Sequence, residues 1–211
     1  MDRVILLHGL WMRGFALRWL ARRVRRAGYA VETFDYASVT RGFAPAVDAL
    51  RARIRAAGEP VHLVGHSLGA LVALEAARAT SARADRRVVC LGPPFRGSAV
   101  ARVLAARPAA RWMLGRSADA LVAGVDAWAG AHRVGVIAGS LPLGFGAALA
   151  ALEAPHDGTV AVAETRLPGI ADHRVVASSH TGLLLSSTVA DLTVDFLRDG
   201  RFARDGSASA C

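Results

Sequence analysis

The sequence predicts one α/β domain, with a mostly parallel sheet of about six strands and helices on both faces. Short β-like runs alternate along the chain with segments of helical period, which is typical of βαβ units. The chain has 211 residues, of which 53% are hydrophobic, and this is enough for a single domain with a sizeable core. No repeat or linker divides the chain, so one domain is predicted over residues 1–199.

The strands are expected at residues 3–8, 30–36, 61–65, 87–92, 133–139 and 173–178. Helical patterns lie between and after them, at 14–27, 44–57, 68–79, 98–130 and 186–198. Gly28 and Gly58 end the first two helices, and the long fourth segment is broken near Gly115. Residues 200–211 are small and polar, which predicts a flexible tail.

Charge and cysteine content exclude several classes of protein. The net charge is +9 and every basic residue is arginine, with the densest cluster at Arg22–Arg26. This cluster is interpreted as the solvated face of an amphipathic helix, so no nucleic-acid partner is expected, because no aromatic platform accompanies the charge. The positive charge favours attraction to an anionic lipid interface, with transient contact, or to acidic substrates over nucleic-acid binding. Cys90 and Cys211 form neither a disulfide framework nor a metal motif.

No uninterrupted apolar segment is long enough to span a bilayer, so no integral membrane segment is expected. The opening "MDRVILLHGLW" lacks a basic region and a small-residue cleavage site. The sequence therefore predicts a cytoplasmic location.

The stretch "LVGHSLGA" places Ser67 between an expected buried strand and a helix, within a G-x-S-x-G pattern. A nucleophilic serine at such a junction needs a sharp, strained turn, and Gly65 and Gly69 remove side chains that would clash there. The start of the helix also supplies N–H groups where negative charge develops during acyl transfer. The alternative is a serine that only caps the helix.

A serine nucleophile needs a base and an acid that orients the base, in the chain order serine, acid, histidine. His180 follows the last expected strand and fits the place of the base, whereas His66 is expected to turn its side chain away. Asp157, on a turn between the fifth and sixth strands, is the predicted acid. Asp172 is the alternative, and Glu153 and Glu164 fit less well.

The oxyanion hole needs two N–H donors. We assign one to Leu68, which follows the nucleophile, and the other to Leu10 in the loop "HGLW" after the first strand. Trp11 is the second choice in that loop.

Together, "VILLHGLW", "LVGHSLGA", "LGPPFRGS", "HDGTV" and "SSHTGLLLSS" resemble the α/β-hydrolase superfamily, and the small bacterial lipases and esterases in particular. The resemblance extends over residues 3 to 198. It implies the triad Ser67–Asp157–His180 and an ester-hydrolysing activity that needs no metal or cofactor. Two departures stand out: the sheet is trimmed at its start, and the segment 96–132 is long for a lidless lipase.

Apolar residues gather on the loops that should face Ser67, and an acyl chain suits such a lining. The predicted lining residues are Trp11, Met12, Phe95, Trp112, Met113, Leu143, Phe145 and Leu183, with Leu141 beside them. Residues 98–130 are interpreted as a helical cap that turns Trp112 and Met113 toward the pocket. The alternative is an ordinary crossover helix packed on the sheet.

The leading hypothesis is a serine hydrolase that cleaves carboxylic esters of medium acyl or lipid-like acids, through an acyl-enzyme on Ser67. A thioesterase or acyltransferase with the same triad is the second hypothesis. A hydrolase-fold module that binds a partner without catalysis is the third. The oligomeric state does not follow from the sequence.

Overall fold

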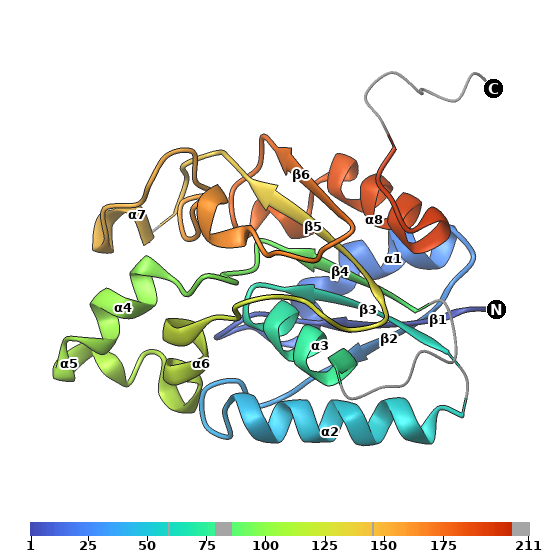
Figure 1. The fold of residues 1–211 in the computed structure, drawn as a ribbon, viewed down its shortest axis with the longest axis horizontal. Coiled ribbons are helices and arrows are strands. Elements are labelled where there is room, and N and C mark those ends of the chain that lie inside the picture. Colours follow the sequence, from blue (N-terminus) through green and yellow to red (C-terminus); the bar gives the residue numbers. More distant parts are fainter. Residues whose placement is uncertain (59, 79–85, 145, 204–211) are drawn as a thin grey trace.

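The computed structural model describes residues 1–58, 60–78, 86–144 and 146–203. It contains a six-stranded parallel sheet in the order β2-β1-β3-β4-β5-β6, which confirms the predicted fold class (Figure 1). The strands are β1 (Arg3–Leu7), β2 (Ala30–Phe34), β3 (Val61–His66), β4 (Arg87–Leu91), β5 (Arg133–Gly139) and β6 (Asp172–Val176). Each begins within one residue of its expected start and ends within two residues of its expected end.

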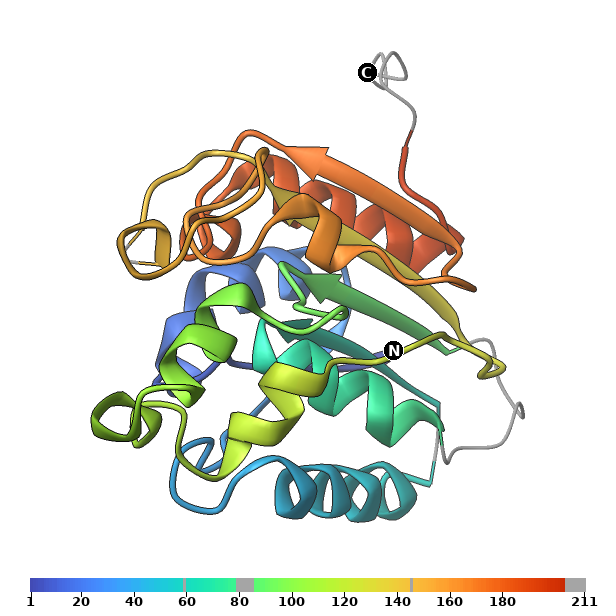
Figure 2. The same cartoon turned by 60° about the vertical axis from the view of Figure 1, so that its left-hand side comes forward.

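Helices cover both faces of the sheet, as Figures 1 and 2 show. One face is covered by α1 (Arg18–Arg26), which follows the short helix η1 (Gly14–Leu17), and by α8 (Ser187–Asp199). The other face is covered by α2 (Phe43–Ala56) and α3 (Leu68–Arg78). Side chains alternate along β1, so Val4 and Leu6 pack toward α1 while Ile5 and Leu7 pack toward α3. The inner strands β1, β3, β4 and β5 are therefore buried on both sides, as their apolar runs predict, whereas the edge strands β2 and β6 are only partly buried.

The order of the strands fixes where a ligand site belongs. The chain steps from β1 to β2 in one direction and then returns past β1 to β3, so the order reverses between β1 and β3. Open parallel sheets bind ligands in the crevice at the carboxyl ends of the strands beside such a switch point. The loop after β1 begins at His8, and Ser67 follows β3 directly, so both flank this crevice.

The segment between β4 and β5 is helical, as predicted, but it is divided into short pieces. These are α4 (Ala99–Ala105), α5 (Pro108–Arg111), η2 (Gly115–Ser117) and α6 (Ala118–Ala123). Pro108 begins α5, where its missing N–H leaves no hydrogen bond unmade. In Figure 1, these helices lie at the end of the sheet to which the strand arrows point. The connection from β5 to β6 contains α7 (Gly146–Leu149) and η3 (Val162–Thr165), and η4 (Gly182–Leu184) follows β6.

The predicted tail differs from the structure at its start. Phe202 is only 2% exposed and packs against Phe196 with ring centroids 4.9 Å apart. Its backbone N–H donates to Asp172 Oδ2 at 2.9 Å. The C-terminal packing therefore continues beyond residue 199, while residues 204–211, including Cys211, lie outside the described residues.

None of the helices in the described part of the chain has both the length and the apolar character needed to cross a bilayer.

Candidate active site

Ser67 lies in a left-handed backbone conformation at the junction of β3 and α3. Its φ is 53°, a value that a residue with a side chain seldom adopts outside functional sites. A Cβ atom at Gly65 would collide with the backbone of Gly69 and Ala70, and one at Gly69 with the backbone of Leu7 and His8. The two glycines of the motif therefore allow the strand, the turn and the helix to approach closely, which is the strained turn expected for an exposed nucleophile.

His180 and Asp157 are held together by two hydrogen bonds. The ring Nδ1 of His180 lies 2.7 Å from Asp157 Oδ2, and the backbone N–H of His180 donates to the carbonyl oxygen of Asp157 at 2.9 Å. Asp157 comes from the loop between β5 and β6, and His180 follows β6. The side-chain bond fixes the ring and makes Nδ1 the protonated nitrogen, which leaves Nε2 able to accept a proton.

Asp157 is buried, with 1% of its surface exposed, and it stays ionised through its hydrogen bonds. Burial alone would raise the pKa of this carboxyl group. The hydrogen bond and charge of His180, together with the N–H groups of Val160 and Thr159 that donate to Oδ1 at 2.7 and 2.9 Å, outweigh that effect. The pKa of Asp157 therefore lies below its ordinary value, so the group is a carboxylate at neutral pH.

The loop after β1 brings backbone N–H groups to the same crevice. Leu10 and Trp11 line the cavity that contains Ser67, and Trp11 has a φ of 60°. The loop is anchored at His8, because the Tyr36 hydroxyl donates to the His8 carbonyl oxygen at 2.8 Å and the two rings stack with centroids 4.5 Å apart. Leu68 is the first residue of α3, where helical N–H groups have no partner within the helix.

His66 was missed as a site residue, because its side chain was expected to turn away. The structure places its ring against that of His180, with centroids 4.7 Å apart. His66 Nε2 donates to the carbonyl oxygen of His180 at 2.9 Å. Burial, followed by the neighbouring His180, lowers the pKa of His66 to about 3, so this ring is neutral at physiological pH. The alternation of side chains along β3 predicts which face of the sheet His66 lies on. It does not predict that His180, from the loop after β6, packs against it.

A cavity of about 260 Å³ contains both Ser67 and His180. Its walls are mostly apolar: α4 supplies Val100, Ala101 and Leu104, the turn after α5 supplies Leu114, and α6 supplies Leu121. Within the described residues, no hydrogen bond joins the Ser67 hydroxyl to the His180 ring. Contacts of this kind commonly tighten only when the substrate is bound.

The predicted lining residues do not all reach the cavity. Trp11 and Met12 line the cavity, as expected. Phe95 and Leu183 are fully buried in the core instead, because each continues the apolar packing of a neighbouring strand or helix. Leu143 and Leu141 are exposed away from the cavity, Met113 packs against the core without reaching the cavity, and Phe145 lies outside the described residues.

The helical segment covers the cavity with residues other than those predicted. Trp112 is 65% exposed and packs edge-on against Trp11, but it does not line the cavity that contains Ser67. The Trp11 indole N–H donates to the Met113 carbonyl oxygen at 2.6 Å, which ties this segment to the loop after β1. The apolar side chains that this segment contributes to the cavity come mainly from α4, with Leu121 from α6, and the helical cap itself stays a prediction.

The alternative acids lie elsewhere. Asp172 begins β6 and accepts hydrogen bonds from the N–H groups of His173 and Phe202, at the amino end of the strand. Glu164 accepts from the N–H groups of Ala99 and Ala161, so it holds the start of α4. Glu153 is exposed. Among the described residues, no group of three or more His, Cys, Asp or Glu side chains is arranged to hold a metal ion.

Comparison with known proteins agrees with this architecture. A family model described as the alpha/beta hydrolase family matches residues 4–206. The mature form of the Bacillus licheniformis lipase BlEst2 has a TM-score of 0.74 and 21% identity, over 87% of this chain and 86% of that one. The propeptide form of the same lipase gives the same TM-score, but this chain spans only 47% of its length.

Two further solved structures share the fold at lower similarity. A metagenomic carboxyl esterase has a TM-score of 0.59 and 18% identity, over 85% of this chain and 64% of that one. The thioesterase domain that cyclises the lipopeptide surfactin has a TM-score of 0.60 and 15% identity, over 93% and 91%. At these identities the likeness is one of fold. No curated protein sequence matches the chain.

Proposed function

We propose that this chain, which belongs to the alpha/beta hydrolase family, is a serine hydrolase that cleaves carboxylic esters through an acyl-enzyme on Ser67. The observation that carries the proposal is the buried His180–Asp157 pair, joined at 2.7 Å, whose histidine lines the same cavity as a serine held in a strained turn. Esters are favoured because this fold is shared with two solved structures named as a lipase and as a carboxyl esterase.

The reaction has two halves. His180 takes the proton of the Ser67 hydroxyl as the oxygen attacks the ester carbonyl, and Asp157 stabilises the ring while it carries the extra charge. The N–H groups of Leu68 and Leu10 hold the oxyanion, and the proton then passes from His180 to the leaving oxygen. A water molecule, deprotonated by His180, attacks the acyl-enzyme and releases the acid together with free Ser67.

The walls of the cavity indicate the acyl group. Leu104, Leu114 and Leu121 offer an apolar surface beside Ser67, and a cavity of about 260 Å³ has room for an acyl chain of medium length. The polar groups in the cavity are concentrated at the catalytic side chains and near Thr159 and Thr181. An apolar acid esterified at its carboxyl group fits this distribution better than a polar acyl group does.

The proposal is tested with p-nitrophenyl esters and with a fluorophosphonate that labels activated serines. Wild-type protein should hydrolyse the esters and be labelled, and Ser67→Ala should lose labelling and at least about 10³-fold of turnover. Ser187→Ala, at an exposed serine of α8, is the matched control and should behave as wild type.

Labelled wild-type protein that prefers an acyl-thioester to the oxygen ester of the same acid would move the assignment to a thioesterase with the same triad. Folded wild-type protein that neither hydrolyses esters nor reacts with the fluorophosphonate would refute the enzymatic reading, in favour of a binding module.

A further inference from the structure

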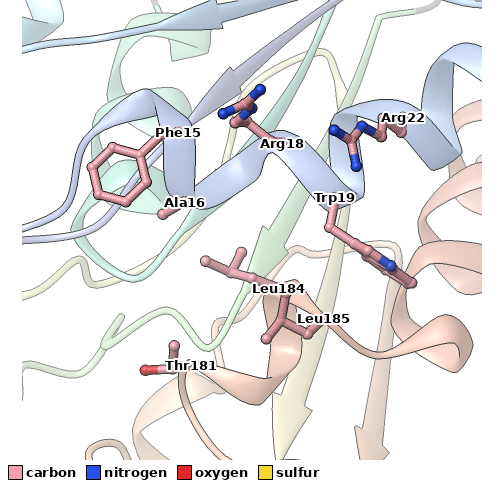
Figure 3. Close-up of a pocket in the computed structure, with 8 residues that line it drawn as sticks. All are labelled: Phe15, Ala16, Arg18, Trp19, Arg22, Thr181, Leu184 and Leu185. Atoms are coloured by element: carbon pink, nitrogen blue, oxygen red, sulfur yellow. The ribbon is translucent and has the colours of Figure 1, made fainter.

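A second groove adjoins the catalytic cavity, between α1 and the segment that follows β6. Figure 3 shows its eight lining residues, which enclose about 490 Å³. The groove is lined on one side by Phe15, Ala16, Arg18, Trp19 and Arg22, and on the other by Thr181, Leu184 and Leu185. Neither the mechanism nor the acyl pocket described above uses this groove.

The groove combines an apolar body with a cationic margin. Trp19 extends from α1 toward Leu184 and Leu185 in Figure 3, and Phe15 and Leu185 are 71% and 60% exposed. Large apolar side chains left this open to solvent on both walls of one groove are typical of a binding surface.

The two arginines of the groove are not used by the fold. Arg18 and Arg22 are exposed, and neither guanidinium group makes a hydrogen bond or an ion pair with any other described residue. Arg23, on the same helix, is by contrast paired with Asp191 at 2.6 Å. Because Arg18 and Arg22 are one helical turn apart, their α-carbons are separated by about 6 Å along α1. Two guanidinium groups at this spacing suit one anion with several acceptor oxygens.

Thr181 connects the groove to the chemistry. It follows His180 directly and lines both the groove and the catalytic cavity. In acyl transfer, the histidine that deprotonates the serine then protonates the leaving oxygen, so the leaving group must lie beside that histidine. With the acyl chain in the cavity under α4, the leaving group has its exit on the Thr181 side, toward the groove.

We infer that this groove binds the leaving group of the substrate, and that the leaving group is an alcohol carrying a phosphate beyond a short apolar stem. The inference rests on the proposed ester hydrolysis and specifies its substrate class. The stem lies on Trp19 and Leu184, and the phosphate is held by Arg18 and Arg22. Water cleaves the acyl–oxygen bond in two steps, so the products are the free acid and the phosphorylated alcohol, whose oxygen receives its proton from His180.

The experiment compares three octanoyl esters whose alcohols are propanediol monophosphate, butanol and choline. The measured quantity is the discrimination ratio, defined as kcat/KM for the phosphate ester divided by kcat/KM for the butanol ester. In Arg18→Gln/Arg22→Gln this ratio should fall by about 10-fold or more relative to wild type. The double variant should also accept the choline ester better relative to the butanol ester, because a repulsive charge pair has been removed.

The matched control is Arg55→Gln/Arg201→Gln. It removes the same number of positive charges, two, from exposed arginines that do not line the groove. It should leave the discrimination ratio within about two-fold of wild type. Added salt should lower the discrimination ratio in wild type and in this control, because it screens the attraction between the phosphate and the two arginines. In Arg18→Gln/Arg22→Gln that attraction is absent, so salt should change the ratio much less.

The two levels of the proposal fail in different ways. A wild-type protein that cleaves the butanol ester through Ser67, with the same ratio in Arg18→Gln/Arg22→Gln as in wild type, overturns the inference on the leaving group and leaves ester hydrolysis standing. An equal fall of the ratio in both double variants also overturns it, because net charge then explains the effect. A folded wild-type protein that cleaves none of the three esters overturns both.

Discussion

Under the proposed ester hydrolysis, the length of the acyl chain that the protein accepts should be set by Ala101 on α4. Ala101 is buried and lines the catalytic cavity, so Ala101→Leu adds three carbon atoms to the space that the proposed acyl chain occupies. Leucine is a strong helix former, and the change keeps the position apolar. The perturbation therefore acts on volume and leaves the catalytic side chains untouched.

The magnitude follows from the volume of the cavity. If a methylene group occupies roughly the volume of one water molecule, about 30 Å³, a cavity of about 260 Å³ holds an acyl chain of about eight carbons. Each buried methylene contributes about 0.8 kcal/mol, which corresponds to at most about four-fold in kcat/KM. We therefore expect kcat/KM to rise with chain length up to about eight carbons in wild type and up to about five in Ala101→Leu.

The assay is hydrolysis of p-nitrophenyl esters with acyl chains that lengthen by one or two carbons, measured below their solubility limits. Ala109→Leu, the same change at an exposed position of α5, is the control and should keep the wild-type optimum. Short esters should be cleaved by Ala101→Leu at close to the wild-type rate, which shows that the site is intact. An optimum that does not shift, or a loss that is equal for short and long chains, would refute the argument that this cavity holds the acyl chain.

Two further predictions concern the catalytic pair and its support. Asp157→Asn should lower turnover by several orders of magnitude, near 10⁴ in the serine-protease precedent, because an amide stabilises the wrong ring tautomer, whereas Asp172→Asn should change it little; steady-state kinetics on both variants checks this, and the reverse order would make Asp172 the acid. The free energy of unfolding should fall as pH drops from about 6.5 to about 4.5, by up to about 1.4 kcal/mol per pH unit from His66, because the unfolded chain binds a proton there that the buried ring, with its pKa lowered to about 3, does not. Urea titrations at several pH values should give a shallower dependence for His66→Gln, and equal slopes would contradict this account.

The fold and the positions of the candidate catalytic residues follow from local signals. Strand and helix periods, a glycine on each side of Ser67, and turn residues around Asp157 all act over a few residues, so the sequence expresses them directly. Predicting that Asp157 and His180 meet required only that each follows a strand of one parallel sheet, because the carboxyl ends of such strands lie at the same edge.

The lining of the cavity depends on packing between segments, and the sequence does not express that. Phe95 and Trp112 lie in the regions expected, yet one is buried in the core and the other is exposed on the surface. Apolar character alone does not distinguish these two fates, since Phe95 lies in irregular backbone after β4 and Trp112 caps the end of a single-turn helix, where no long period sets the direction of the side chain. Arg18 and Arg22 show that the same holds for charged residues. Their spacing predicts an exposed helix face, but it does not tell whether that face is open surface or the wall of a groove.

In the proposed mechanism, bond breaking and substrate fit are carried by separate stretches of this chain. The catalytic side chains sit on loops fixed by the sheet, while much of the acyl pocket comes from one excursion between β4 and β5, whose first helix is held at Ala99 by Glu164. Exchanging that excursion for another helical insert, with Glu164 and the N–H at position 99 retained, would graft a new acyl preference onto unchanged chemistry. Such a division lets descendants of one ancestor specialise through insertions and deletions in a single loop, and it offers protein engineers the same point of entry.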